Sequence, residues 1–344
     1  MTTDAMRRRN GSSPAVETAA LIGTELTRVL RACGAEAGHY AVLGPDPWKI
    51  IWNDDRSGFA AFLEARACVL SWRSPVAAAA DQPTLLARLL DYARVVNKQL
   101  VAVPVSEDVA TTAANMGMRT TWIGTECFID LTTWSLEGGR RQKVRWARNH
   151  AVKLGMTWRE AFPLRSADDF DGLQRVEERW KQQRRERRTD SFLRNEFTEL
   201  AHLRRYFVCE GAAGVVASVT CTPINADSWY LQDPVRDPDA PRGALEGAMA
   251  YALDALRNDG YLWASNGPLP FWRAGGEQGH DHSLGPLGDR VLAYFDRRYR
   301  FARINRFRAK FVPDVTKPVY VIRSHRIVTP PVVASLVRLL TRAG

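Results

Sequence analysis

An acidic and a basic residue lie three positions apart at the end of a segment that is typical of a β-strand. The segment, 229–236, reads Trp-Tyr-Leu-Gln-Asp-Pro-Val-Arg and therefore ends in Asp233 and Arg236. A short loop with Gly243 follows, and then an apolar-striped segment with Glu246 whose spacing predicts a helix. Such a strand end and helix start place an acid, a base and free backbone N–H groups around one point, which is an arrangement suited to acyl transfer.

Asp233 and Arg236 also fit a simpler interpretation. An Asp-x-x-Arg pair also occurs as an ion pair on the surface of a turn, and such pairs stabilise a protein weakly. Position favours a ligand site, because open α/β sheets bind ligands where a central strand ends against a helix start. Coenzyme A is disfavoured here, since the loop has the single Gly243 and two acids, Asp237 and Asp239, that would repel phosphates.

Length and composition limit the possible architectures. The 344 residues predict two domains, and no apolar run is long enough to cross a bilayer. No signal peptide is recognisable, so we expect a cytoplasmic protein. The five cysteines form no CxxC pair, which argues against a disulfide framework or a zinc site, and we expect neither metal nor cofactor. His280-Asp281-His282 is interpreted as a plain loop.

The net charge of +10 favours a polyanionic partner such as nucleic acid, anionic lipid or a phosphorylated substrate. Three blocks, 140–155, 175–194 and 297–310, combine basic residues with aromatic ones, a mixture that suits a single-stranded RNA end. In the first block Arg141, Arg145 and Arg148 share one helical face. Each block taken alone is also compatible with a solvated helix face.

Hydrophobic periodicity predicts an α/β fold in which one order of elements occurs twice. In the first half we expect helices over 16–32, 81–93 and 106–117, and strands at 40–43, 49–52, 67–72, 100–105 and 127–131. In the second half we expect helices over 167–185 and 244–257, and strands at 205–209, 215–220, 228–233, 261–265 and 318–322. The resulting division is a disordered tail, 1–15, and two domains, 16–135 and 136–344.

The second half resembles the aminoacyl-tRNA-dependent transferase domain of the phosphatidylglycerol lysyltransferase family, and especially its soluble relatives such as the seryl-tRNA-using transferase of the valanimycin pathway. The resemblance covers about 40–322. The segments that carry it, in order, are 124–131, 135–138, 153–155, Asp233-Pro234-Val235-Arg236, Gly243-Ala244-Leu245-Glu246 and 307–313.

This resemblance implies tandem GNAT-like domains with mixed central sheets and a tunnel in which aminoacyl-tRNA meets a hydroxyl-bearing acceptor. It implies catalytic roles for Asp233, Arg236 and Glu246, with Glu246 positioning Arg236 or the α-ammonium group of the amino acid. Together with the basic blocks it implies tRNA contacts for the residues Arg141, Arg145, Arg148, Arg308 and Lys310. Trp229, Trp263 and Asn266 are expected to line the acceptor side of the tunnel.

The acceptor is less well defined, because the family's Leu-Gly-x-Ala-Pro-Leu segment is replaced by Ser265-Asn266-Gly267-Pro268-Leu269-Pro270. The membrane-spanning half of the lipid enzymes has no counterpart in the sequence, so we expect a small-molecule hydroxyl or hydroxylamine acceptor. Phosphatidylglycerol is the alternative acceptor. A non-catalytic RNA-binding protein on a GNAT-like scaffold and an acetyl-CoA enzyme are the other possibilities, and the oligomeric state is open.

Overall fold

The computed structural model describes residues 16–183, 197–272, 293 and 301–341. The predicted disordered tail and the His280-Asp281-His282 loop lie outside the described residues, as do parts of the second and third basic blocks. Among the described residues, no helix is both long enough and apolar enough to cross a bilayer.

The first part of the described chain forms five strands and three α-helices. In chain order these are β1 (Val16–Thr18), α1 (Gly23–Cys33), β2 (Lys49–Trp52), β3 (Phe59–Glu64), β4 (Cys68–Trp72), α2 (Gln82–Val95), β5 (Gln99–Ser106) and α3 (Glu107–Asn115). Two short 3₁₀ helices, η1 (Ala19–Leu21) and η2 (His39–Leu43), flank α1. We call β1 to β5 with these helices the N-terminal half.

The second part repeats the pattern with longer strands. Its elements are β6 (Arg119–Asp130), α4 (Gln142–Lys153), β7 (Thr157–Ala161), α5 (Ala167–Gln183), η3 (Ala201–Leu203), β8 (Arg205–Gly211), β9 (Gly214–Pro223), β10 (Ser228–Arg236), α6 (Ala244–Asn258), β11 (Trp263–Pro270), α8 (Phe301–Arg308), η4 (Ala309–Phe311), β12 (Val315–Arg323) and α9 (Pro330–Thr341). We call β6 to β11 with α4 to α8 the C-terminal half.

The described strands form one sheet in the order β1-β2-β3-β4-β5-β12-β6-β11-β10-β9-β8-β7. β12 joins the halves, because it pairs with β5 of the N-terminal half on one side and with β6 on the other. Within the described sheet the parallel pairs are β4–β5 and β10–β11, and each is connected through one crossover helix, α2 or α6. The predicted α/β architecture of two GNAT-like halves is confirmed.

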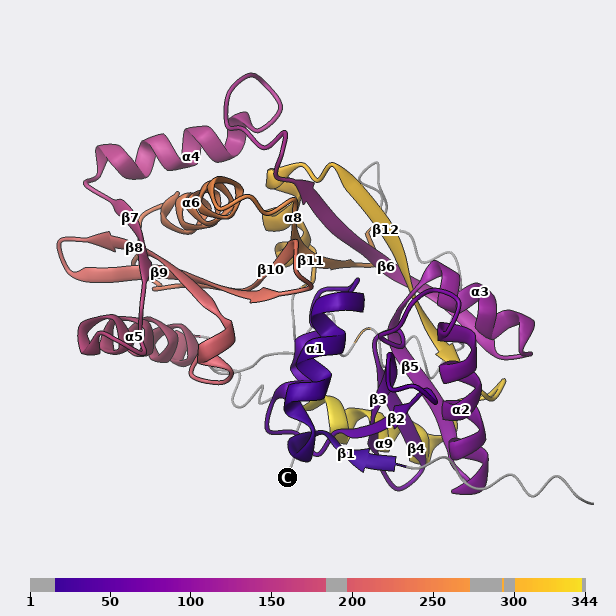
Figure 1. Cartoon of the computed structure of the whole chain (residues 1–344). Coiled ribbons are helices and arrows are strands. Elements are labelled where there is room, and N and C mark those ends of the chain that lie inside the picture. The colour runs from indigo at the N-terminus through magenta and orange to yellow at the C-terminus, as the bar shows by residue number, and fades with distance from the viewer. Residues whose placement is uncertain (1–15, 184–196, 273–292, 294–300, 342–344) are drawn as a thin grey trace, which may run out of the picture.

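Helices cover both faces of the sheet (Figure 1). In the C-terminal half, α4 and α6 pack on one face through an apolar cluster that includes Val144 and Leu253, and α5 packs on the other through Leu173 and Val176. In the N-terminal half, α1 and α9 contact one face, and α2 and α3 the other. Burial of these apolar faces is what drives the sheet and the helices together.

The start of α6 is fixed by an unusually close approach to α4. Gly243 precedes the helix with φ +99°, and a Cβ at this position would lie 1.9 Å from the carbonyl oxygen of Ala147. Only glycine combines that backbone conformation with that contact. The single glycine of the loop therefore sets the distance between α6 and α4.

Some local predictions were wrong. The expected strand 40–43 is the 3₁₀ helix η2, held between Gly38 and Gly44, with Tyr40 and Val42 buried in the core. The expected helix over 16–32 begins only at Gly23, because residues 16–18 pair with β2 and form the sheet edge. Strands β3 and β7 and helices α8 and α9 were missed.

A buried ion pair ties the N-terminal half to β6. Arg73 follows β4 with φ +65° and donates from Nη1 to Glu126 Oε2 at 2.7 Å, and both side chains are nearly fully buried. The other carboxylate oxygen of Glu126 accepts the backbone N–H of Ala37 at 2.8 Å. Because both charges are removed from water, burial of each one is tolerated only while its partner is present.

Glu126→Gln should lower the free energy of unfolding by about 3 kcal/mol, because it leaves the Arg73 guanidinium buried without a counter-charge. Denaturant unfolding monitored by circular dichroism would measure the change. The control is Asp91→Asn, which breaks the exposed Arg94–Asp91 pair and should cost less than about 1 kcal/mol. Equal effects of the two substitutions would contradict the structural importance of the buried pair.

Candidate functional site

β10 and β11 separate after a short stretch of pairing. They are paired at Ser228–Trp263, Trp229–Ala264 and Tyr230–Ser265 only. Beyond these pairs β10 stays hydrogen-bonded to β9, and β11 to β6. Both strands are irregular where they part, β10 between residues 231 and 233 and β11 between residues 265 and 267. The sheet therefore opens between these strands, and we call this opening the β10–β11 divergence.

Glu246 and Lys310 come together beside the divergence. Glu246 lies buried in the first turn of α6, and Lys310 lies in η4, which follows α8. Lys310 Nζ donates to Glu246 Oε1 at 2.7 Å and lies 5.4 Å from the centre of the Phe307 ring. The sequence associated Glu246 with Arg236 or the α-ammonium group, whereas its partner in the structure is Lys310. The carboxylate thus holds a half-buried cation at a fixed place.

Arg308 crosses β11 where that strand is irregular. Its Nη1 donates to the carbonyl oxygen of Pro268 at 2.5 Å, and a Cβ on Gly267 would lie within 2.9 Å of the guanidinium. Asn266 Nδ2 donates to the carbonyl oxygen of Arg308 at 3.1 Å. Gly267 has φ +88°, so glycine both permits the bend of the strand and makes room for the arginine. The structure therefore groups Asn266, Arg308 and Lys310.

Asp233 and Arg236 lie on opposite faces of β10. Asp233 pairs with Thr220 and, with Ser218, Thr220 and Val235, lines a small cavity under α5. Arg236 pairs with Ala217, which belongs to the apolar cluster under α6. Directly opposed residues of neighbouring strands share a face, so Arg236 projects on the α6 side of the sheet and Asp233 on the α5 side. Because the two residues are three positions apart on one strand, their side chains project from opposite faces and do not meet.

The acids of the β10–α6 loop are neutralised within the protein. Arg179 of α5 binds Asp237 at 2.9 Å through Nε and Asp239 at 2.6 Å through Nη2. Asp237 is buried and accepts the backbone N–H of Asp239, which orders the turn before Gly243. These carboxylates are therefore structural features of the loop, and Arg179 offsets the repulsion of phosphates that the sequence suggested.

The three predicted tRNA-contacting arginines, one just before α4 and two within it, make contacts within the protein. Arg141 is buried, donates to the carbonyl oxygen of Phe311 at 3.0 Å and to Asp314 at 2.9 Å, and burial lowers its pKa. Arg145 donates to the carbonyl oxygen of Leu136 at 2.8 Å, and Arg148 lies 3.9 Å from Asp254. These side chains link α4 to the loops and helices around it.

A different part of the surface around α4 combines basic and aromatic groups. Trp146 is 54% exposed and stacks on His150 with ring centres 5.7 Å apart. The guanidinium of Arg242, from the loop before α6, lies 4.7 Å from the centre of a Trp146 ring. Trp146 and Arg242 were not among the predicted site residues. Their signal in the sequence is the position of Trp146, one residue after Arg145 and outside the apolar stripe of the helix.

The two predicted tunnel tryptophans also lie on opposite faces of the sheet. Trp229 belongs to the cluster under α6 and meets Tyr261 edge-on with ring centres 5.5 Å apart. Trp263 packs against the cluster of Ala37, Phe128, Ile224 and Tyr230 on the other face. Each tryptophan thus extends a separate apolar layer next to the paired ends of β10 and β11.

Two further polar residues near the divergence were missed from the sequence. Tyr230 is buried at the last paired position of β10; burial raises the pKa of its hydroxyl, and the charges of Arg308, Asp233, Arg73 and Glu126 act on it. Asn305, buried in α8, donates from Nδ2 to the carbonyl oxygen of Pro270 at 2.8 Å and so holds α8 against the end of β11. The sequence gives one indication of each: Tyr230 is a polar residue in an apolar segment, and Asn305 is an uncharged polar residue in a basic segment.

Among the described residues, no group of three or more His, Cys, Asp or Glu side chains is arranged to hold a metal ion. Burial raises the pKa of the Cys127 thiol to about 12 and that of Cys209 to about 12, which makes both poor nucleophiles. The described polar side chains near the divergence include the cations Arg308 and Lys310, the Glu246 carboxylate and the Asn266 amide.

Comparison with known proteins gives a consistent picture. A family model described as phosphatidylglycerol lysyltransferase, C-terminal, matches residues 49–323. A phosphatidylglycerol lysyltransferase of Staphylococcus epidermidis is 21% identical over 277 residues, which are 80% of this chain and 32% of the relative. One from Staphylococcus aureus is 22% identical over 263 residues, 76% of this chain and 31% of the relative. The chain spans about a third of the length of these curated relatives.

Solved structures share the fold. L-PGS from Bacillus licheniformis superposes with a TM-score of 0.74 at 18% identity, over 97% of this chain and all of that one. The C-terminal domain assigned to a lysylphosphatidylglycerol synthetase from Agrobacterium fabrum superposes with a TM-score of 0.76 at 19% identity, over 94% of this chain and 98% of that one. Since the family model covers most of the chain, the protein belongs to the family defined by the C-terminal domain of phosphatidylglycerol lysyltransferases.

Proposed function

We propose that this protein transfers an aminoacyl group from aminoacyl-tRNA to a hydroxyl group of phosphatidylglycerol. The observation that carries the proposal is the family match over 49–323, which includes the whole β10–β11 divergence and the Glu246–Lys310 pair. The sequence alone favoured a small-molecule acceptor. The names of the relatives favour the lipid instead, because they are phosphatidylglycerol lysyltransferases.

The proposed reaction is an ester exchange that needs no cofactor. The acceptor oxygen attacks the carbonyl carbon of the aminoacyl ester, and negative charge develops on the carbonyl oxygen. The bond to the tRNA ribose then breaks, and the acceptor proton ends on the ribose oxygen. Because the ester is already activated, the protein has only to orient the two reactants, move one proton and stabilise the oxyanion.

Lys310 is suited to the electrostatic part of this task. Its ammonium group is held by Glu246 at 2.7 Å and is about one-third exposed, so it is fixed in place and accessible to a ligand. Preorganised cations stabilise developing negative charge without reorganisation at the moment of reaction. We assign Lys310 and Arg236 to the oxyanion or the terminal tRNA phosphates, and Glu246 to the positioning of Lys310.

The tRNA end has two groups of cationic side chains to contact. Arg308 lies at the divergence itself, and the exposed Trp146 with His150 and Arg242 offers a stacking surface beside the start of α6. Guanidinium groups bind phosphates, and aromatic rings stack on unpaired bases such as those at a tRNA 3′ end. We therefore extend the predicted tRNA contacts from Arg308 and Lys310 to this surface.

Lys310→Gln should lower kcat/KM by roughly 100-fold, because removal of a positioned group that stabilises an oxyanion has effects of this size. Radiolabelled aminoacyl-tRNA would be incubated with phosphatidylglycerol vesicles, and label in the organic extract would be counted. Glu246→Gln should lower the rate as well, and the double variant should lose less than the sum of the two. The control is Lys317→Gln, which changes an exposed lysine of β12 and should keep the rate.

Additive losses for Lys310 and Glu246 would contradict their action as a pair. Label that accumulates as an RNase-resistant, water-soluble aminoacyl product and not in the lipid would restore the small-molecule acceptor. A preparation that binds tRNA and transfers nothing to either acceptor would support the RNA-binding alternative.

Asp233→Asn tests the carboxylate on the α5 side of β10. If Asp233 orients the acceptor or the α-ammonium group, the substitution should reduce transfer by roughly 100-fold and leave tRNA affinity within about twofold. Filter binding with charged tRNA and the same extraction assay would measure the two quantities. Unchanged transfer would remove Asp233 from the site.

A further inference from the structure

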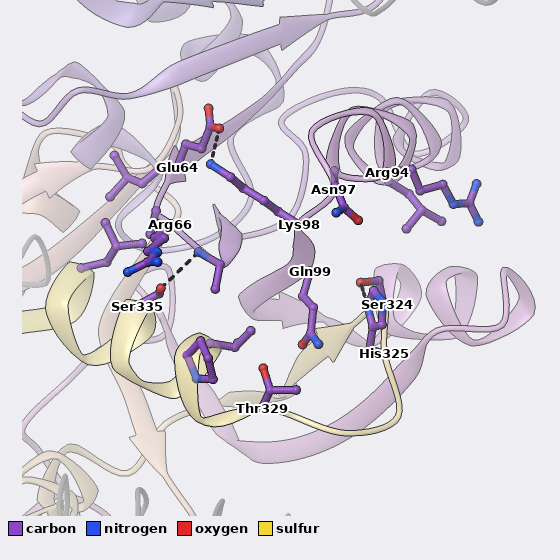
Figure 2. A pocket seen from close by; sticks show the side chains of 18 of the residues that line it. Glu64, Arg66, Arg94, Asn97, Lys98, Gln99, Ser324, His325, Thr329 and Ser335 are labelled. Carbon is purple, nitrogen blue, oxygen red and sulfur yellow. Dashed lines mark hydrogen bonds and ion pairs between the residues drawn. The ribbon is translucent and has the colours of Figure 1, made fainter.

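A large cavity lies in the N-terminal half, and none of its lining residues belongs to β10, β11, α6 or α8. Its volume is about 1720 Å³, which exceeds that of pockets for ordinary small ligands. It opens between the β3–β4 hairpin, the last turns of α2, the loop before β6 and the first turns of α9 (Figure 2). Residues 324–329, which connect β12 to α9, form part of the wall. We call it the basic pocket.

Cations outnumber carboxylates in its lining. The cations are Lys49, Arg66, Arg94, Lys98 and Arg338, and the carboxylates are Asp46 and Glu64. Glu64 is already satisfied, because Lys49, Lys98 at 2.5 Å and the Tyr92 hydroxyl at 2.9 Å all donate to it. Burial alone would raise the pKa of Glu64, but these hydrogen bonds outweigh it and lower the pKa to about 2. The pocket therefore keeps a surplus of positive charge.

Arg66 and Arg338 hold most of that surplus at one side of the pocket. Arg66 lies in the β3–β4 hairpin, and its neighbour Ala67 donates its backbone N–H to Ser335 Oγ of α9 at 3.3 Å. Arg338 is one helical turn beyond Ser335, and both arginines are exposed. Within the described part of the chain, no carboxylate lies within 4.0 Å of either guanidinium. Guanidinium groups bind phosphate oxygens well, and the Ala67–Ser335 hydrogen bond brings together the two segments that carry Arg66 and Arg338.

The rest of the lining combines aliphatic side chains with polar ones, which include Asn97, Gln99, His325 and Thr329. Leu63, Leu90, Met118, Val332 and Leu339 contribute apolar surface. Beside the lining, Val95 of α2 is 62% exposed and Ile327 of the 324–329 loop is 71% exposed. No Phe, Trp or Tyr is among the described residues that line the pocket.

RNA-binding sites commonly combine cations with aromatic rings that stack on bases. The basic pocket instead combines cations with exposed aliphatic side chains, as membrane-associated surfaces do. We propose that it binds the phosphate headgroup of an anionic phospholipid and docks the protein on a bilayer surface. Arg66 and Arg338 hold the phosphate, and Val95 and Ile327 enter the acyl region. This docking site is separate from the proposed transfer site and goes beyond the proposed transfer reaction.

The test is cosedimentation of the full chain with vesicles, without tRNA, so that its outcome does not depend on the transfer reaction. The wild type should bind vesicles that contain phosphatidylglycerol and should not bind pure phosphatidylcholine vesicles. Arg66→Gln/Arg338→Gln should weaken the binding by roughly thirtyfold, since each cation near an anionic surface contributes about a factor of five. Ile327→Ser should weaken it further, and circular dichroism would verify folding.

The matched control is Arg165→Gln/Arg175→Gln, which removes two exposed arginines next to and within α5, at the other end of the sheet. It should retain wild-type binding within about twofold. An equal loss in both double variants would overturn the proposal, since binding would then follow net charge alone. Loss of tRNA affinity with unchanged vesicle binding in the Arg66/Arg338 variant would also overturn it and would identify an RNA contact.

Discussion

β10 and β11 share three residue pairs and then part, and the proposed site depends on that separation. Backbone groups along the two inner edges lose their sheet partners there. Arg308 and Asn266 occupy the β11 edge, while Asp233 and Arg236 lie on β10. The buried Glu126 carboxylate accepts hydrogen bonds from the Arg73 guanidinium and the Ala37 backbone N–H. It also lies 3.5 Å from the Ser265 hydroxyl of β11, at the start of the opening. The Arg73–Glu126 ion pair thus connects the N-terminal half to β11 at the point where β11 separates from β10.

Pairing within the protein separates the basic residues into two groups. Arg141 and Arg73 are buried, bind carboxylates within the protein and connect segments that are distant in sequence. Lys310 is also paired, but it remains about one-third exposed. A guanidinium buried with its partner contributes to the geometry of the fold, whereas a fixed and accessible cation can contribute to binding. The net charge of the chain does not distinguish these two uses.

The sequence predicted the α/β class, the repeated order of elements and most strands of the second half, because period-2 and helical patterns report burial directly. Glu246 and Lys310 were both proposed as site residues from the sequence, but not as each other's partners, since 64 positions separate them. Side-chain direction was harder to predict. The irregularity of β10 before Asp233 and the pairing with β9 decide that Asp233 and Arg236 point to opposite faces. The inward contacts of Arg141 depend on the 311–314 segment, which local periodicity cannot reveal.

We propose that the aminoacyl ester and its acceptor meet at the β10–β11 divergence. A crystal structure of the protein with an amide-linked aminoacyl-adenosine, which mimics the end of charged tRNA and cannot react, tests this claim most directly. We predict that the amide carbonyl lies between β10 and β11 within hydrogen-bond distance of Lys310 Nζ. An analogue bound elsewhere, with Lys310 still engaged only by Glu246, would contradict it.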